Sequence, residues 1–385
     1  MARERLSTLF FAVFGLSATS WGGIALMAQL ERRYVERKQL LSPQAFADLV
    51  AIAWAVPGPV ACNVAVQLGY ALRGARGALL AGIASVLPFF LAMVALAAAY
   101  EHHALPAVLN PEVLPKLRLV LVCLIGVTLW RQAKSLLSGR TEQAVTVLAC
   151  LLLWFNPAPV VLVSILLASF GFGWVTGPRT GAPLVLPKVS RAAQGALALC
   201  AAGLLAFVCV PVGAAVNLAL ETLRQAGASL TLFGGAFSAF PVLHALFVEG
   251  ANGVPADTFN TAFALSALVP GPLLNVVPFL GLLHGGVTSA LLASCAFFAT
   301  PGVLAVVAHR WLSVLRQSAR FEHALRLLRA ATTAFLASAI LRLAPQIPVT
   351  PLNAALALVC VTVLARTKLP VYWLYLGVAI VALIA

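Results

Sequence analysis

The sequence predicts an all-α polytopic membrane protein built from two inverted six-helix repeats joined by one linking helix, with about 13 transmembrane spans. Hydrophobic residues make up 62% of the 385 positions and charged residues only 9%, against roughly 45–50% and 25% in soluble domains. The apolar residues form blocks of about 20, the length needed to cross about 30 Å of hydrocarbon. Because lipid offers the backbone no hydrogen-bond partners, these blocks are expected to be helices.

An internal repeat is the second observation. Moving forward 213 positions carries Val56-Pro57-Gly58-Pro59 onto Val269-Pro270-Gly271-Pro272. The same offset relates further pairs: Gly22 and Gly235, Glu36 and Glu249, Pro88 and Pro301, and Lys116 and Arg329. Several prolines held in register across a whole half indicate duplication. We therefore predict a first unit over 1–175, a linker with one transmembrane helix over 176–222, and a second unit over 223–385.

Each element of this architecture follows from the apolar blocks. In the first unit we expect six spans, near 8–30, 44–70, 75–99, 113–130, 142–155 and 157–175. An extra apolar span, near 192–220, has no counterpart in the repeat. Since six spans plus one is an odd number, the second unit is expected to enter the membrane from the opposite side, as in inverted-repeat carriers.

Loop charge tests this topology. The net charge is +14, from 25 Lys and Arg against 11 Asp and Glu, and the basic residues concentrate between apolar blocks, as cytoplasmic loops and anionic lipid require. With a cytoplasmic N-terminus, 17 of the 25 fall inside. Four of the others, Arg32, Arg33, Arg37 and Lys38, cluster outside. Either the first hairpin is partly re-entrant, or a basic outer surface is needed there.

Other chemistry finds little support in the sequence. The seven cysteines lie in apolar blocks without C-x-x-C spacing, and the six histidines form no H-E-x-x-H pattern. G-x-S-x-G and P-loop motifs are also missing. We therefore predict no metal, no cofactor, no enzymatic activity and no nucleic-acid partner; the lipid bilayer is the surrounding medium.

A Pro-Gly-Pro inside an apolar span removes two backbone donors and interrupts the helix. Such breaks persist in membranes where the freed groups line a cavity or meet a substrate. The N-terminal end of a half-helix offers unpaired N–H groups and partial positive charge, which suit an anion. A plain packing kink is the alternative, but two such motifs at equivalent positions favour a binding site.

The candidate substrate-binding residues surround these motifs: Gly22, Gly23, Arg32, Arg33, Pro57, Gly58, Pro59, Asn63, Gly234, Gly235, Pro270, Gly271, Pro272 and Asn275. The asparagines are expected to donate to oxyanion oxygens, with polar contacts between helices as the alternative. The glycine pairs allow close backbone approach, to a ligand or to another helix. The arginines offer bidentate contacts to a dianion, or anchor lipid head groups.

Acids that are candidates for proton coupling are few. They are Asp48, Glu36 and Glu249, none of which falls clearly at the middle of an apolar block. Energy coupling is therefore left open by the sequence.

The pattern resembles the chromate ion transporter family, in its full-length two-domain form. The resemblance rests on Gly22-Gly23, Glu31-Arg32-Arg33-Tyr34-Val35, Phe46-Ala47-Asp48, Pro57-Gly58-Pro59, Asn63 and Gly69-Tyr70, and on Phe233-Gly234-Gly235, Pro270-Gly271-Pro272, Asn275 and Gly281. It implies a secondary transporter in the cell inner (plasma) membrane that exports chromate. Our mechanistic hypothesis is alternating access, with the anion held between the two Pro-Gly-Pro breaks. Sequence departures at Ile24, Trp54 and Ala236 leave the anion open.

Three alternatives remain beside chromate efflux. Chromate and sulfate are both tetrahedral dianions, and a site built from N–H groups discriminates weakly between them, so uptake of sulfate or another oxyanion is one. An anion channel and a membrane scaffold are the others. A homodimer is also left open.

Overall fold

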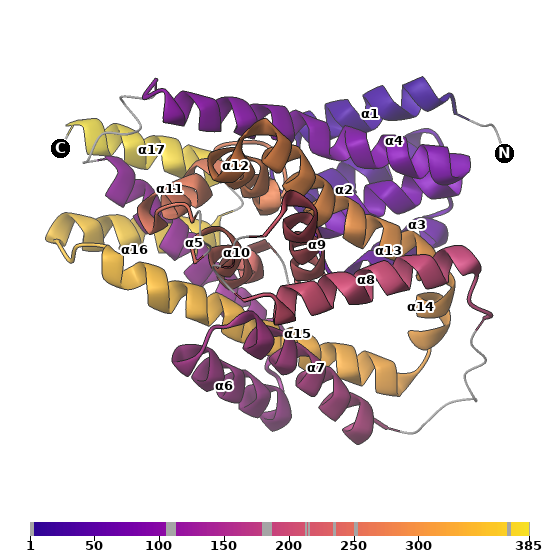
Figure 1. Cartoon of the computed structure of the whole chain (residues 1–385). Coiled ribbons are helices and arrows are strands. Elements are labelled where there is room, and N and C mark those ends of the chain that lie inside the picture. Colours follow the sequence, from indigo (N-terminus) through magenta and orange to yellow (C-terminus); the bar gives the residue numbers. More distant parts are fainter. Residues whose placement is uncertain are drawn as a thin grey trace.

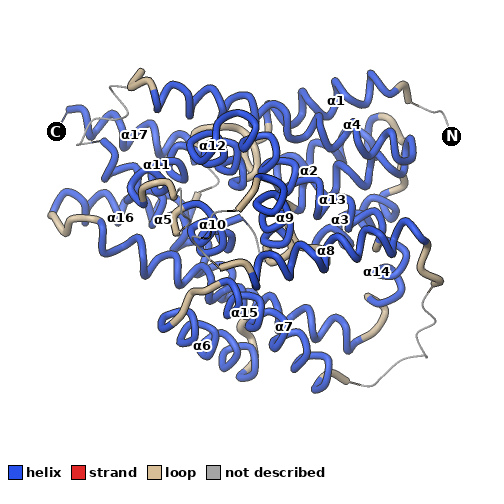
Figure 2. The backbone as a smooth tube through the Cα atoms, in the orientation of Figure 1, coloured by secondary structure: helices blue, strands red, loops and turns tan. Residues whose placement is uncertain are grey.

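The computed structural model describes residues 4–104, 113–178, 187–211, 214, 216–233, 236–249, 253–367 and 371–384. Within these ranges the chain is helical and contains no β-strand (Figure 2). Among the described residues, five helical segments are long and apolar enough to cross a membrane: Val60–Glu101, Val113–Leu136, Pro159–Thr176, Val276–Val307 and Ala319–Gln346. Shorter apolar helices accompany them. The predicted class, an all-α polytopic membrane protein, is confirmed.

The helices of the first part of the chain are α1 (Leu6–Thr19), α2 (Gly23–Glu31), α3 (Pro43–Ala55), α4 (Val60–Glu101), α5 (Val113–Leu136), α6 (Arg140–Phe155) and α7 (Pro159–Thr176). The span expected over 8–30 is not one helix, because the chain bends at 20–22 between α1 and α2. A π-helical turn, Arg32–Arg37, extends α2. Lys38 then forms an ion pair with Glu4, so α1 and α2 fold back on each other. The position of this hairpin relative to the membrane stays a prediction.

The span expected over 44–70 is also two helices. Gln67 Nε2 donates to the Leu49 carbonyl at 3.3 Å, and these residues stand equally far on either side of Gly58. Consequently α3 and the start of α4 form an antiparallel hairpin around Pro-Gly-Pro.

A second turn lies inside α4, at Arg73 and Gly74, where Gly74 has φ +64°. The backbones of Gly69 and Gly77 are in direct contact, since a Cβ at Gly69 would overlap the Gly77 carbonyl. α4 is therefore two antiparallel helices, of which the second, residues 75–101, is about 40 Å long.

The rest of the chain repeats this plan. Its helices are α8 (Arg191–Cys209), α9 (Leu218–Ser229), α10 (Phe240–Phe247), α11 (Ala256–Ser266), α12 (Val276–Ser294), α13 (Thr300–Val307), α14 (His309–Leu315), α15 (Ala319–Leu343), α16 (Pro351–Arg366) and α17 (Val371–Ile384). α12 turns at Gly285 and Gly286. A Cβ at Gly281 would lie 2.7 Å from Ala290 Cα, the same close contact that Gly69 makes in α4.

Helices of the two units pack along each other, α15 against α5, α6 and α7 for example, and two sets of polar contacts between the units mark opposite ends of the molecule. Gln67 approaches His309 at 3.2 Å at one end, beside α3 and α14 (right in Figure 1). At the other end Arg118 Nη1 donates to Asp257 Oδ1 at 2.9 Å, and Tyr100 meets Thr258 at 3.2 Å. The second segment of α4 connects the two ends. The described part of the N-terminus lies at the first end and that of the C-terminus at the second (Figure 1).

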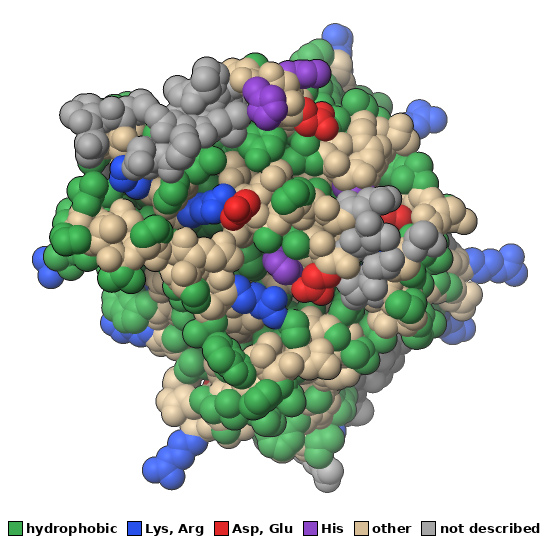
Figure 3. All heavy atoms as spheres, turned by 60° about the vertical axis from the view of Figure 1, so that its left-hand side comes forward, with side chains coloured by type: hydrophobic (Ala, Val, Ile, Leu, Met, Phe, Trp, Pro, Cys, Tyr) green, Lys and Arg blue, Asp and Glu red, His purple; other side chains and the backbone are tan. Residues whose placement is uncertain are grey.

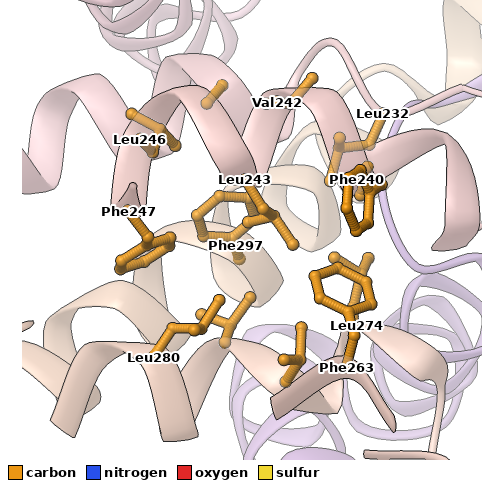
Figure 4. Close-up of a cluster of buried hydrophobic side chains, with 14 of the residues drawn as sticks. Leu232, Phe240, Val242, Leu243, Leu246, Phe247, Phe263, Leu274, Leu280 and Phe297 are labelled. Carbon is orange, nitrogen blue, oxygen red and sulfur yellow. The ribbon is translucent and has the colours of Figure 1, made fainter. Parts of the chain in front are cut away.

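One cluster of buried hydrophobic side chains surrounds the short helix α10. Phe240 and Phe247 are buried, with Phe263 and Phe297 among the side chains packed around them (Figure 4). This packing lets non-helical backbone exist inside the protein without meeting lipid. The outer surface is also rich in hydrophobic side chains, as expected of a protein surrounded by hydrocarbon. On the face shown in Figure 3, basic, acidic and histidine side chains gather near the middle, and further Lys and Arg side chains project at the edge.

The glycine contact inside α4 gives a stability prediction. Gly69→Ala pushes a methyl group into the Gly77 backbone, and overpacking of this kind costs about 1–3 kcal/mol. Gly126→Ala in α5 is the matched control, because no atom lies within 4 Å of its Cβ position. In denaturant unfolding, we expect Gly69→Ala to lower the free energy of unfolding and Gly126→Ala to leave it equal or higher. Equal effects would contradict the hairpin.

Candidate functional site

Each interrupted helix is hydrogen bonded to the bend in the other unit. Gly58 N–H donates to the Leu232 carbonyl at 2.8 Å, and Gly271 N–H donates to the Ser20 carbonyl at 2.9 Å. Both acceptors stand two positions before a glycine pair, Gly22-Gly23 in one unit and Gly234-Gly235 in the other. In the repeat register, which pairs Gly22 with Gly235, the two acceptors differ by one position, so the hydrogen bonds are similar in the two repeats.

A short stretch of parallel backbone pairing adds to the second of these two contacts, the one made by Gly271. Gly22 N–H donates to the Gly271 carbonyl at 3.1 Å, and Trp21 pairs with Gly271. The structure thus brings Gly22 to the second Pro-Gly-Pro. The predicted residues Gly234 and Gly235 lie outside the described residues.

The central glycines also pack against the other unit. A Cβ at Gly58 would lie 2.6 Å from the Pro301 ring, and one at Gly271 would lie 3.0 Å from Phe89. Their φ angles are +95° and +137°, in the region that favours glycine. Phe89 follows Pro88, the repeat counterpart of Pro301. Each glycine therefore allows close approach to a proline-containing segment of the opposite repeat.

Two helix N-termini lie side by side in the first unit. α2 begins at Gly23 and α4 at Val60, and a Cβ at Gly23 would lie 3.3 Å from Ala61 Cβ. The first N–H groups of a helix have no intrahelical acceptor and carry partial positive charge. The adjoining ends of α2 and α4 therefore offer donors of the kind that bind anions.

Asn63 and Asn275 are fully buried, but their amides face the helix breaks. Asn63 Nδ2 donates to the Pro57 carbonyl at 3.1 Å. Asn275 Nδ2 donates to the Ser266 and Val269 carbonyls at 3.0 and 3.2 Å. These bonds satisfy carbonyls freed at the ends of α3 and α11, and they use both amide hydrogens of Asn275.

The remaining amide oxygens of both asparagines are buried without a partner. An unsatisfied buried acceptor costs about 1–3 kcal/mol, so each Oδ1 is suited to an O–H, N–H or cationic group. These two oxygens are not contacts for a fully deprotonated anion.

Arg32 and Arg33 lie away from the breaks. Nine residues of helix separate Arg32 from Gly22, a distance of about 14 Å. Arg32 is exposed, and Arg33 is half-buried with an unpartnered Nε. They therefore belong to the end of the molecule where Lys38 meets Glu4, and the structure does not join them to the interrupted helices.

Arg329 is the cationic residue that sequence reasoning missed as a site residue. Its Nη2 donates to the Trp54 carbonyl at 2.9 Å, close to the end of α3. The Arg329 guanidinium, from the second unit, thus lies close to the Pro57-Gly58-Pro59 break of the first unit. A signal existed in the repeat, because Lys116 and Arg329 are in register inside apolar spans, but only the fold directs Arg329 toward a break.

The three candidate coupling acids lie outside this region. Asp48 is exposed and accepts a hydrogen bond from Gln44 at 3.2 Å, and Glu36 is exposed. Glu249 pairs with His244 at 3.1 Å. The hydrogen bond from His244, with Arg342 nearby, lowers the pKa of Glu249. Glu249 therefore stays ionised at neutral pH, which does not favour proton carriage by this carboxylate.

Two glycine-to-alanine variants can distinguish the effect of backbone strain on stability from the effect of packing. Gly22 and Gly58 have similar φ angles, +88° and +95°, but only the Gly58 Cβ position is occupied, by Pro301. Gly22→Ala should cost about 1–3 kcal/mol of strain, because φ +88° with ψ 158° is a conformation adopted almost only by glycine. Gly58→Ala should cost similar strain plus the displacement of the Pro301 ring. Thermal unfolding should rank wild type above Gly22→Ala and Gly22→Ala above Gly58→Ala. Equal unfolding midpoints for the two variants would contradict the close packing of Gly58 against Pro301.

Comparison with known proteins gives a match in each of the two repeats. The family described as chromate transporter matches residues 7–174 and 222–383. A chromate transport protein of Pseudomonas aeruginosa is 28% identical over 75% of this chain and 68% of its own length. One from Cupriavidus metallidurans is 28% identical over 76% and 69%.

An uncharacterized transporter of Methanocaldococcus jannaschii is 24% identical over 87% of this chain and 84% of its own length. No solved structure matches the chain. Because the family match covers both halves, the chain belongs to the chromate transporter family, whose members are transporters and not enzymes.

Proposed function

We propose that this protein is a secondary transporter that carries a tetrahedral oxyanion, chromate, out of the cytoplasm by alternating access. The observation that carries the proposal is the reciprocal hydrogen bonding of Gly58 and Gly271 to the opposite repeat. Relatives named chromate transport proteins support the choice of anion. Sulfate or another oxyanion is the alternative substrate.

The arrangement of equivalent helices supports an inverted repeat. α3 starts at the end where Gln67 meets His309, whereas its counterpart α11 starts at the end where Arg118 meets Asp257. In this topology the hairpins α1–α2, α3–α4, α9–α10 and α11–α12 are re-entrant. The crossing segments are the long parts of α4 and α12–α13, together with α5, α6, α7, α8, α15, α16 and α17. Nine crossings replace the thirteen expected. Five of them, the long part of α4 and α5 to α8, precede the second unit, and this odd number inverts it.

The charge distribution supports this topology. A re-entrant first hairpin moves Arg32, Arg33, Arg37 and Lys38 to the side that already holds 17 of the 25 basic residues. Only Lys116, Arg118, Arg224 and Arg342 then stay on the other side. By the positive-inside rule the first end, with the N-terminus, faces the cytoplasm of a cell inner membrane.

The proposed anion site lies at the N-terminal ends of α2 and α4. Their N–H groups bind the oxyanion oxygens, and Arg329 supplies positive charge at the adjoining end of α3. A dianion needs such compensation to leave water. The amide hydrogen bonds of Asn63 and Asn275 hold the breaks open in this arrangement.

Alternating access is supported by the way each central glycine packs against the opposite repeat. Gly58 rests on Pro301 and Gly271 on Phe89, so motion of one repeat against the other changes both contacts together. In alternating access, one central site opens first to one side of the membrane and then to the other, and this requires the two repeats to move in a coupled way. Both breaks come from one chain, so the proposed site does not need a second copy.

Topology is tested by cysteine labelling in a cysteine-free background. Gln39→Cys, Gln317→Cys and His102→Cys are at exposed positions. An impermeant maleimide should label positions 39 and 317 from the cytoplasmic side and position 102 from the opposite side. A permeant maleimide, as control, should label all three. Labelling of positions 39 and 102 from the same side would reject the re-entrant hairpin.

Transport is tested with chromate in proteoliposomes. Arg329→Gln removes a charge-assisted contact worth about 1.5–3 kcal/mol, so we expect the KM for chromate to rise about tenfold or more. The matched control is Arg326→Gln on the same helix, because Arg326 is exposed; its KM should stay near that of the wild type. Equal KM values for both variants would remove Arg329 from the site.

Two readouts of the same assay separate the alternatives. Saturable chromate flux that sulfate does not inhibit supports a chromate carrier, and sulfate flux that chromate competes away supports the broader oxyanion carrier. Flux linear in concentration and insensitive to Arg329 would identify a channel. No flux of either anion would favour a scaffold.

A further inference from the structure

A cavity of about 490 Å³ lies between the two arms of α4 and the segment α12–α13. We call it the α4–α13 groove. Its lining is almost entirely apolar and includes Val66, Ala78, Gly82, Phe298 and Val303. A charged substrate gains nothing from such a surface, so the groove is distinct from the proposed anion site.

We propose that the α4–α13 groove binds one anionic phospholipid, with an acyl chain in the groove and the phosphate at Arg73 and Arg76. The groove follows α4 from Ala75 to Phe90, a length of about 22 Å. That exceeds half of a hydrocarbon core of about 30 Å. It therefore suits a single chain that enters from one leaflet.

The groove is open to the surrounding lipid. Leu79 is 66% exposed, and Val303 on the opposite wall is 50% exposed. Both belong to segments long and apolar enough to span the membrane. The molecules that surround these walls are therefore lipids, and the remaining question is which head group the groove selects.

Positive charge gathers at one end of the groove. Arg73 lies at the turn of α4 and Arg76 directly beyond it, while Arg310 follows the lining residue Val307 by three positions. Within the described ranges, none of these arginines forms an ion pair or a side-chain hydrogen bond. The three guanidinium groups are thus available to a phosphate.

The neighbouring histidine adds no charge at neutral pH. His309 contacts Gln67 at 3.2 Å, and burial lowers its pKa. The selectivity of this end therefore depends on arginine. Each basic residue near an anionic head group increases binding by about a factor of five, so Arg73 and Arg76 together give about 30-fold.

The charge pattern favours lipid over a second copy of the chain as the occupant. A partner helix would cover the apolar walls but leave the arginines at the rim without countercharge. A single phospholipid covers the apolar walls with its acyl chain and pairs the arginines with its phosphate. Basic pockets at the cytoplasmic side of transmembrane helices commonly bind anionic head groups.

The test is lipid retention by the purified full chain in native mass spectrometry, with phosphatidylglycerol and phosphatidylcholine offered in equal amounts. The wild type should retain phosphatidylglycerol preferentially. The double variant Arg73→Gln/Arg76→Gln should lose that preference by about 30-fold. The matched control Arg140→Gln/Arg366→Gln removes two exposed arginines of α6 and α16, helices that contribute no residue to the groove, and should retain it.

A second pair of variants tests the apolar part. Ala78→Phe fills the groove with the charges intact, and Ala95→Phe places the same ring on an exposed position of α4 outside it. Only Ala78→Phe should release the lipid.

Equal retention of both lipids by the wild type, or unchanged retention in the Arg73/Arg76 variant, would overturn the proposal. Disulfide cross-linking of Leu79→Cys between two copies would also overturn it, in favour of a dimer contact.

Discussion

The structure depends on one constraint, that backbone N–H and C=O groups freed inside a membrane must find partners within the protein. Two Pro-Gly-Pro motifs interrupt helices, and each break is completed by the opposite repeat. Gly58 donates to Leu232 and Gly271 to Ser20. The asparagines then cap carbonyls at the ends of α3 and α11. These bonds add to the packing of α15 against α5, α6 and α7, which also joins the two repeats.

The same constraint explains the surroundings of the breaks. Non-helical backbone is tolerated because α10 and its aromatic neighbours shield it from lipid (Figure 4). Glycine is needed at the centre of each motif, where Pro301 or Phe89 approaches. The breaks leave a pair of helix ends, those of α2 and α4, whose donors have no intrahelical partner. The anion site that we propose and the contacts that hold the repeats together therefore involve the same breaks.

Much of this could be predicted from the sequence, for identifiable reasons. Proline removes donors wherever it stands, so the breaks at Pro57 and Pro270 were predictable, and the repeat register indicated their equivalence. The span over 8–30 was predicted wrongly as one helix. Hydropathy measures apolar length and cannot separate one crossing from two shorter helices. The signal that pointed to the hairpin was electrostatic, the misplaced cluster from Arg32 to Lys38.

Side-chain roles were harder to predict than positions. Asn63 and Asn275 were expected to contact the anion, but an asparagine one turn after a break is also placed to cap that break. Which option applies depends on the path of the preceding residues. Arg329 was used only to align the repeat, because its approach to Trp54 joins segments far apart in the chain. Gly234 and Gly235 lie outside the described residues, so their role stays a prediction.

Amide hydrogen exchange tests the central claim most directly. Proline has no amide hydrogen, so each Pro-Gly-Pro contains a single one, that of Gly58 or Gly271. If both breaks are hydrogen bonded to the opposite repeat, both amides should exchange slowly, as in a helix core. Exchange of either amide at the rate of an unstructured peptide would contradict the account.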